Sequence, residues 1–182
     1  MPDHIYSEQT HFLLTEINEF YDRFGNNRAR HQTKAIGAVT NEVVRKHLAE
    51  EGISVSDRNV FIDGFPTEWD LIVHKPSAMP EVGCVWRPSD VLAVIEIKYS
   101  GLYDSDSISR LNNTFSLLTQ KHPHIKPFYF TLMETTSAQD KVTDDTLGCR
   151  ALTLHWHRQR KGEYVYEITD HWELLVNDLK NL

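Results

Sequence analysis

The stretch "VLAVIEIKYSG", from Val91 to Gly101, decides how the rest of the chain is interpreted. Its apolar beginning is typical of a central strand that is covered on both faces. Glu96 and Lys98 then follow two positions apart, before an exit of small residues at Ser100 and Gly101. A carboxylate and an ammonium on a buried strand are costly unless they are paired, hydrated or bound to a ligand. The end of this strand is therefore a candidate functional site.

Side chains of a strand alternate between its two faces. The alternation predicts one face with Leu92, Val94, Glu96 and Lys98, and an opposite face with Val91, Ala93, Ile95 and Ile97. Glu96 and Lys98 are thus expected to be neighbours on one face.

A second acid stands inside an apolar run upstream, in "EWDLIVHK" at residues 68–75. We expect this run and "NVFIDG" at 59–64 to be short strands that form a hairpin around Gly64 and Pro66. Alternation along 68–75 predicts Glu68, Asp70 and Ile72 on one face and Trp69, Leu71 and Val73 on the other. If this strand lies beside the strand at 91–101, the carboxylates of Asp70 and Glu96 converge.

Two converging carboxylates beside a lysine suit phosphodiester hydrolysis. Mg²⁺ prefers one or two carboxylates together with waters and a substrate phosphate, and we expect Mn²⁺ to substitute for it. Asp70 and Glu96 are the expected ligands, with the carbonyl of Ile97 as a further one. The ion would polarise the phosphate and lower the pKa of a bound water. Lys98 would orient that water or neutralise charge that develops at phosphorus.

The order of the expected elements indicates an α/β fold with a mixed central sheet flanked by helices. Helices are expected over residues 13–24, 33–51, from Asp104 or Ser105 to about 121, and over 171–182. Strands are expected over 59–64, 68–75, 91–99 and 126–133, with a late hairpin over 150–168. The Pro- and Gly-rich segment 76–90 is expected to be a loop. No composition shift marks a boundary, so residues 1–182 are expected to form one domain.

"EWD" ending at Asp70, followed by "EIK" at Glu96–Lys98, resembles the PD-(D/E)XK nuclease superfamily, which has the restriction-endonuclease-like fold. The resemblance implies an αβββαβ core over about residues 33–133, extended here by an N-terminal helix and by a C-terminal hairpin plus helix. Many members add a helical glutamate, and "GAVTNEVVRKHL" supplies Glu42 for that role. The residue before the acid is Trp69 rather than proline. The chain also looks like a subgroup of bacterial nucleases that includes anti-phage effectors, which tend to be oligomers.

The formal net charge of −7 argues against a surface that coats DNA everywhere, because non-specific affinity comes mostly from Lys and Arg on phosphates. A local basic patch remains compatible with it. Arg158, Arg160 and Lys161 form the one dense basic cluster, which is either a phosphate-contacting hairpin or a solvated turn. The ten histidines include the pairs His122/His124 and His155/His157, but no second pair completes a zinc pattern.

Cys84 and Cys149 lack metal-ligand spacing, which favours a reduced, cytoplasmic chain. The first residues show no signal peptide, and no apolar run reaches the ~20 residues of a membrane span.

The sequence therefore predicts a Mg²⁺-dependent endonuclease that hydrolyses nucleic acid, with DNA favoured and with a role in bacterial defence or restriction. Asp70, Glu96 and Lys98 are the expected catalytic residues, and Glu42 is expected to assist them, either by binding a second metal ion or by orienting a metal ligand. Cleavage of both strands would require a homodimer or a higher oligomer. The alternatives are a non-catalytic nucleic-acid- or nucleotide-binding module or scaffold, and a structural ion pair between Glu96 and Lys98. DNA or RNA, the recognition sequence and the activating signal stay open.

Overall fold

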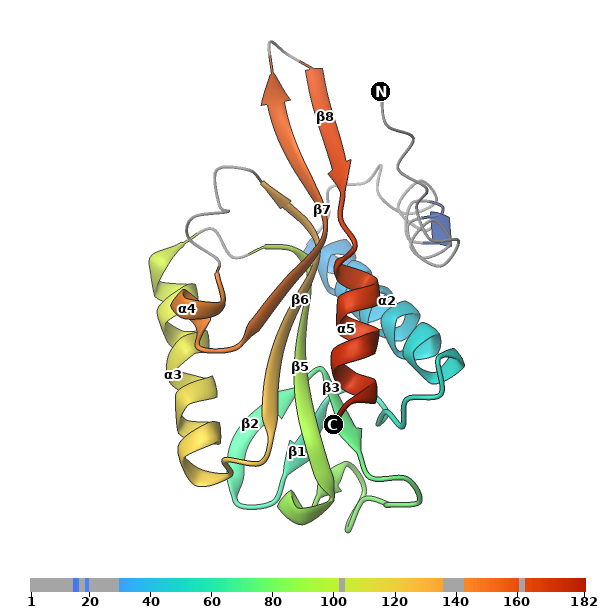
Figure 1. Ribbon diagram of the computed structural model, residues 1–182, viewed down its shortest axis with the longest axis vertical. Coiled ribbons are helices and arrows are strands. Elements are labelled where there is room, and N and C mark those ends of the chain that lie inside the picture. Colours follow the sequence, from blue (N-terminus) through green and yellow to red (C-terminus); the bar gives the residue numbers. More distant parts are fainter. Residues whose placement is uncertain (1–14, 17–18, 20–29, 102–103, 136–142, 161–162) are drawn as a thin grey trace.

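The computed structural model describes residues 15, 16 and 19 and the ranges 30–101, 104–135, 143–160 and 163–182 (Figure 1). Its helices are α2 (Arg30–Glu50), the 3₁₀ turn η1 (Pro88–Asp90), α3 (Ser105–Lys121), α4 (Asp144–Leu147) and α5 (His171–Lys180). Its strands are β1 (Val60–Ile62), β2 (Phe65–Trp69), β3 (Leu71–His74), β4 (Val85–Trp86), β5 (Val91–Ser100), β6 (Lys126–Thr135), β7 (Arg150–Arg160) and β8 (Glu163–Ile168).

The main sheet has the order β3-β5-β6-β7-β8. The inner pairs β5/β6 and β6/β7 are parallel, whereas β3/β5 and β7/β8 are antiparallel. A smaller sheet has the order β2-β1-β4. The predicted α/β class with a mixed central sheet is therefore confirmed, and the late hairpin is the β7–β8 pair.

The main sheet is covered on both faces, as the apolar beginning of β5 predicts. Helices α2 and α5 lie on one face, and α3, α4 and the smaller sheet lie on the other (Figure 1). The first face packs against Val44 and Leu48 of α2 and Trp172 and Leu175 of α5. The second packs against residues that include Phe115 and Leu118 of α3 and Trp69 of β2.

The predicted strand over residues 68–75 divides at Asp70, which lies in a bend. Before the bend the chain pairs with β1 in the smaller sheet, and after it the chain pairs with β5 in the main sheet. Trp69 and Leu71 consequently pack in different apolar clusters, so the prediction that they share a face was wrong. Alternation does not continue across a bend at which the chain changes sheets.

The predicted alternation of β5 is confirmed from Ala93 onward, where Ala93, Ile95 and Ile97 face α2 and α5, and Val94 faces the opposite side. At Val91 and Leu92 the two faces are exchanged. The cause is a register shift between Val73 and His74 of β3, where the β5 partners change from Ala93 to Val91.

Packing explains why a glycine, Gly101, directly follows β5. A Cβ atom built on Gly101 would lie 1.3 Å from a carboxylate oxygen of Glu134, which is fully buried on β6. Only glycine leaves room for that carboxylate.

The helix boundaries follow local sequence signals. The side chain of Asp104 caps α3 by accepting a hydrogen bond from the Ser107 N–H at 2.7 Å, as predicted. The short helix α4 was not predicted, although Thr143 caps it and Gly148 ends it in the left-handed conformation. Residues 76–90, which were expected to be a loop, also contain β4 and the turn η1. Most of the helix predicted over 13–24 lies outside the described residues.

No helix in the described part of the chain has both the length and the apolar character that crossing a membrane requires.

Candidate active site

Asp70 lies where the chain passes from the smaller sheet into β3. Leu71 pairs with Ile95, so the preceding residue is level with Glu96 on β5. Asp70 Oδ2 accepts a hydrogen bond from the backbone N–H of Ile97 at 2.8 Å. The carboxylate thus accepts a hydrogen bond from β5 just before β3 begins to pair with that strand. This bond places an acid directly beside the "EIK" triplet.

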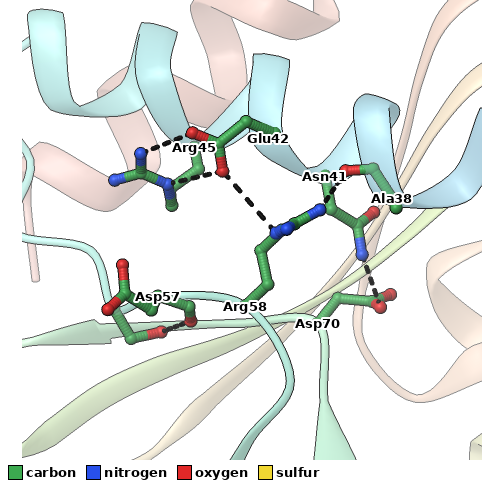
Figure 2. A network of polar contacts seen from close by, with 8 residues as sticks. Ala38, Asn41, Glu42, Arg45, Asp57, Arg58 and Asp70 are labelled. Atoms are coloured by element: carbon green, nitrogen blue, oxygen red, sulfur yellow. Dashed lines mark hydrogen bonds and ion pairs between the residues drawn. The ribbon is translucent and has the colours of Figure 1, made fainter. Parts of the chain in front are cut away.

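Asn41 of α2 holds the other oxygen of the same carboxylate. Its Nδ2 donates to Asp70 Oδ1 at 2.7 Å, and Figure 2 shows the amide pointing from the helix down to Asp70. Asn41 is 7% exposed. The sequence analysis missed this residue, although its spacing from Val44 and Leu48 puts it on the buried stripe of the helix.

Lys98 lies between the two carboxylates. Its Nζ donates a hydrogen bond to Glu96 Oε1, and it is 3.9 Å from Asp70 Oδ2. The three side chains are partly buried, with exposed fractions of 21% for Asp70, 18% for Glu96 and 36% for Lys98. The structure therefore brings together the three residues that the sequence analysis selected from two separate segments. We refer to Asp70, Glu96 and Lys98 as the acidic cluster.

The surroundings of Glu96 oppose its ionisation. Burial raises the pKa of its carboxyl, the negative charge of Asp70 raises it further, and Lys98 only partly offsets both effects. Burial alone would lower the pKa of Lys98, but the charges of Glu96 and Asp70 outweigh it, so the pKa of the ammonium is raised. Lys98 is thus a cation at neutral pH, and the cluster carries more negative than positive charge once Glu96 ionises.

The acidic cluster fits a hard divalent cation. A carboxylate offers about four lone-pair positions, and the hydrogen bonds to Asp70 occupy one position on each oxygen. The described residues include no group of three or more His, Cys, Asp and Glu side chains that could hold a metal. Two carboxylates, waters and a substrate phosphate nevertheless match the usual surroundings of Mg²⁺. The carbonyl of Ile97 stays a predicted further ligand.

Glu42 is engaged elsewhere. Its Oε1 accepts from Arg45 Nη2 at 2.6 Å, and its Oε2 lies 3.6 Å from Arg58 Nε. The hydrogen bond from Arg45 lowers the pKa of the Glu42 carboxyl. Within the described part of the chain, the hydrogen bonds and ion pairs of Glu42 involve neither Asp70 nor Glu96. The predicted role of Glu42, to bind a second metal ion or to orient a metal ligand, stays a prediction. Its neighbour Asn41 is the helical residue that contacts Asp70.

Arg158 and Arg160 of the predicted basic cluster are in the last residues of β7, which forms a hairpin with β8 that extends beyond the end of β6 in Figure 1. The backbone of Arg158 pairs with Val165 and that of Arg160 pairs with Glu163. Lys161 lies outside the described residues. Its role and that of the two arginines in binding nucleic acid stay predictions.

Solved structures of NucC are similar to this chain over nearly its whole length. NucC of P. aeruginosa ATCC27853 in its cAAA-bound form gives a TM-score of 0.60 at 15% identity, covering 94% of this chain and 90% of that chain. NucC of E. coli MS115-1 in its cAAA-bound form gives 0.61 at 14% identity, covering 100% and 93%. Its apo form gives 0.55 at 13% identity, covering 94% and 91%. No protein-family model matches the sequence, and the curated proteins gave no significant match.

The restriction-endonuclease-like fold expected from the sequence is thereby confirmed. The likeness to the NucC structures shows the fold, and the expected relation to anti-phage effector nucleases stays a prediction.

Proposed function

We propose that the chain is a Mg²⁺-dependent endonuclease that hydrolyses phosphodiester bonds of DNA. The observation that carries the proposal is the meeting of Asp70, Glu96 and Lys98, with Lys98 Nζ in contact with both carboxylates. The similarity of fold to NucC supports it, because here an acid directly before β3 lies beside an E-x-K triplet on the neighbouring strand β5.

Each residue of the acidic cluster has a distinct role in the proposed reaction. Asp70 and Glu96 would hold Mg²⁺, which supplies a polarised phosphate and a more acidic bound water. Lys98 is protonated at neutral pH, so it acts as a positive charge beside the phosphate rather than as a base. There it stabilises the negative charge that builds up on the phosphate oxygens in the transition state. Asn41 and the Ile97 N–H fix the direction of the Asp70 carboxylate.

We further propose that the chain acts in the bacterial cytoplasm as a defence nuclease. One acidic cluster per chain would cut one strand at a time, so cleavage of both strands would use a homodimer or a higher homo-oligomer. The fold similarity to NucC supports this setting.

The test is the conversion of supercoiled plasmid to nicked circles by the purified chain, with Mg²⁺ or Mn²⁺. We expect Asp70→Ala and Lys98→Ala each to slow nicking ~100-fold or more, as loss of one transition-state contact does in other enzymes. Asp106→Ala and Lys126→Ala are matched controls, because both side chains are exposed and outside the acidic cluster. They should nick like the parent.

Variants that nick as fast as the parent would contradict the assignment of these residues. A parent that binds plasmid with either ion present but leaves it intact would instead support the non-catalytic binding module.

A further inference from the structure

Glu42, Arg45 and Arg58 form a second polar group beside the acidic cluster, which we call the arginine cluster. One carboxylate holds both guanidinium groups: Arg45 Nη2 and Nε lie 2.6 and 3.1 Å from the two oxygens of Glu42, and Arg58 Nε lies 3.6 Å from one of them. Arg58 Nη1 also donates to the carbonyl of Ala38 at 2.7 Å. Figure 2 shows the Arg58 side chain rising from its loop to reach α2. Both arginines are therefore fixed rather than extended into solvent.

The arginine cluster borders an open pocket of about 500 Å³. The pocket lies between α2 and the loop before β1, and its lining consists of Ala38, Glu42, Arg45, Asp57, Arg58 and Asn59. Arg45 is 28% exposed and Arg58 is 41% exposed, so a bound group can reach both guanidinium groups.

The same two segments hydrogen-bond to Asp70, one to its carboxylate and one to its main chain. Asn41, the neighbour of Glu42 on α2, donates to Asp70 Oδ1. The backbone N–H of Asn59, the neighbour of Arg58, donates to the Asp70 carbonyl at 3.3 Å. On both segments, residues that line the pocket are thus the same as, or chain neighbours of, residues that hydrogen-bond to Asp70.

The guanidinium groups keep donors for a ligand. A guanidinium has five N–H donors in a planar fork that matches the geometry of phosphate. The described contacts of Arg45 use its Nε and Nη2, and those of Arg58 use its Nη1 and Nε. The Nη1 group of Arg45 and the Nη2 group of Arg58 remain available for phosphate oxygens.

The formal charges of the pocket lining balance, because two arginines stand against the carboxylates of Glu42 and Asp57. Arg45 and Arg58 together exceed the single charge of Glu42. Asp57 also lines the pocket, and its carboxylate would compete with a bound phosphate. A phosphate that binds here must therefore use directed hydrogen bonds as well as charge.

We propose that Arg45 and Arg58, held in place by Glu42, bind a DNA phosphate that neighbours the one at the acidic cluster. This inference rests on the proposed function and names the contacts through which the same site holds its substrate. Glu42 is then a positioning residue for the two arginines rather than a metal ligand.

The test measures the affinity for a fluorescent DNA duplex by anisotropy, in Ca²⁺ so that no cleavage occurs. We expect Arg45→Ala and Arg58→Ala each to weaken binding roughly tenfold, the usual effect of losing a charge-assisted hydrogen bond. Removing both arginines together should lower the slope of log affinity against log salt by about 0.9, the value for one phosphate. Asp57→Asn should strengthen binding, because it removes the competing carboxylate.

Matched controls are available on the same elements of the chain. Lys46→Ala removes a positive charge from the next position of α2, and Arg87→Ala removes an exposed loop arginine that pairs with Glu81. Both should change affinity less than twofold. Arg45→Gln and Arg58→Lys, with thermal melting of every variant, separate lost contacts from lost folding. Folded arginine variants that bind DNA like these controls would overturn the inference.

Glu42→Gln distinguishes an arginine-positioning residue from a metal ligand. We expect this variant to bind Mn²⁺ like the parent and to show a DNA affinity altered by the freed arginines, whereas loss of Mn²⁺ binding would overturn the assigned role. A cyclic trinucleotide titrated in the same assay covers the other source of phosphodiesters. If it bound more tightly than the duplex and lost affinity in the arginine variants, the pocket would be a nucleotide site, and the DNA assignment would be wrong.

The readouts keep this inference separate from the proposed function. Loss of DNA affinity in the arginine variants with no nicking by the parent would defeat the proposed nuclease and leave the phosphate site standing. Nicking by the parent with unchanged affinity in the arginine variants would do the reverse.

Discussion

Glu96 and Glu42 are two partly exposed glutamates whose surroundings shift the pKa of the carboxyl in opposite directions. Around Glu96, burial and the charge of Asp70 raise the pKa of the carboxyl. Around Glu42, the hydrogen bond from Arg45 lowers it. Glu96 is thus an acid whose ionised form lacks sufficient compensation, whereas the ionised form of Glu42 is already satisfied by two guanidinium groups.

The difference shows which glutamate is suited to bind a cation. A divalent ion would relieve the unfavourable ionisation of Glu96, so part of the binding free energy is available there. The same ion would have to displace Arg45 and Arg58 from Glu42. Arg45 is visible in the sequence as an i, i+3 partner of Glu42. Arg58 beside Glu42 and Asp70 beside Glu96 come from other segments, so residue type and spacing do not give the full contrast.

The largest expected effect is on the pH dependence of metal binding. Protons compete with the metal for Glu96, whose pKa in the folded chain lies above its ordinary value of 4.5. Mn²⁺ affinity should therefore rise by up to about tenfold per pH unit above that value, and level off once the pH exceeds the raised pKa. Isothermal titration calorimetry at several pH values measures this profile.

Lys98→Gln sharpens the same measurement. Removing the cation that favours ionised Glu96 should move the profile to higher pH.

DNA affinity without metal should stay flat between pH 6 and 8 if the arginine cluster provides it, since Glu42 has a lowered pKa and arginines stay protonated. A Mn²⁺ profile that is flat over the whole range, or that Lys98→Gln leaves in place, would break the contrast between the two glutamates.

A smaller effect is expected from Asn41→Ala. The variant removes the donor to Asp70 Oδ1 and leaves the carboxylate held by the Ile97 N–H alone. Loss of such an orienting partner typically costs ~10-fold in metal affinity. Mn²⁺ titration measures it, and Asn177→Ala on an exposed position of α5 is the matched control. Equal affinities in the two variants would show that Asn41 has only a structural role.

Much of the fold could be predicted because its signals are local. The apolar run of β5, the Asp104 cap of α3 and the stripe Val44–Leu48 each report on a few neighbouring residues. The division of the predicted strand at Asp70 could not be found in this way. It depends on the pairing of β2 in one sheet and β3 in another, and residues 69–71 contain neither glycine nor proline to mark the bend.

The candidate site shows the same limit. Asp70, Glu96 and Lys98 stood out because charged side chains interrupt apolar strands, which is visible in the sequence. Asn41 sits on the buried stripe of α2 and could have been noticed as a polar interruption there. The bonding of Glu42 to Arg58 depends on how a loop folds back on the helix, so the sequence alone favoured the family role for Glu42 instead.

The central claim is that Asp70 and Glu96 together hold one divalent cation, and calorimetric titration of the purified chain with Mn²⁺ tests it most directly. The account predicts binding of about one ion per chain by the parent and by Asp106→Ala, and none by folded Asp70→Asn or Glu96→Gln at the same concentrations. Equal Mn²⁺ binding by these two variants and the parent, or no binding by the parent, would contradict it.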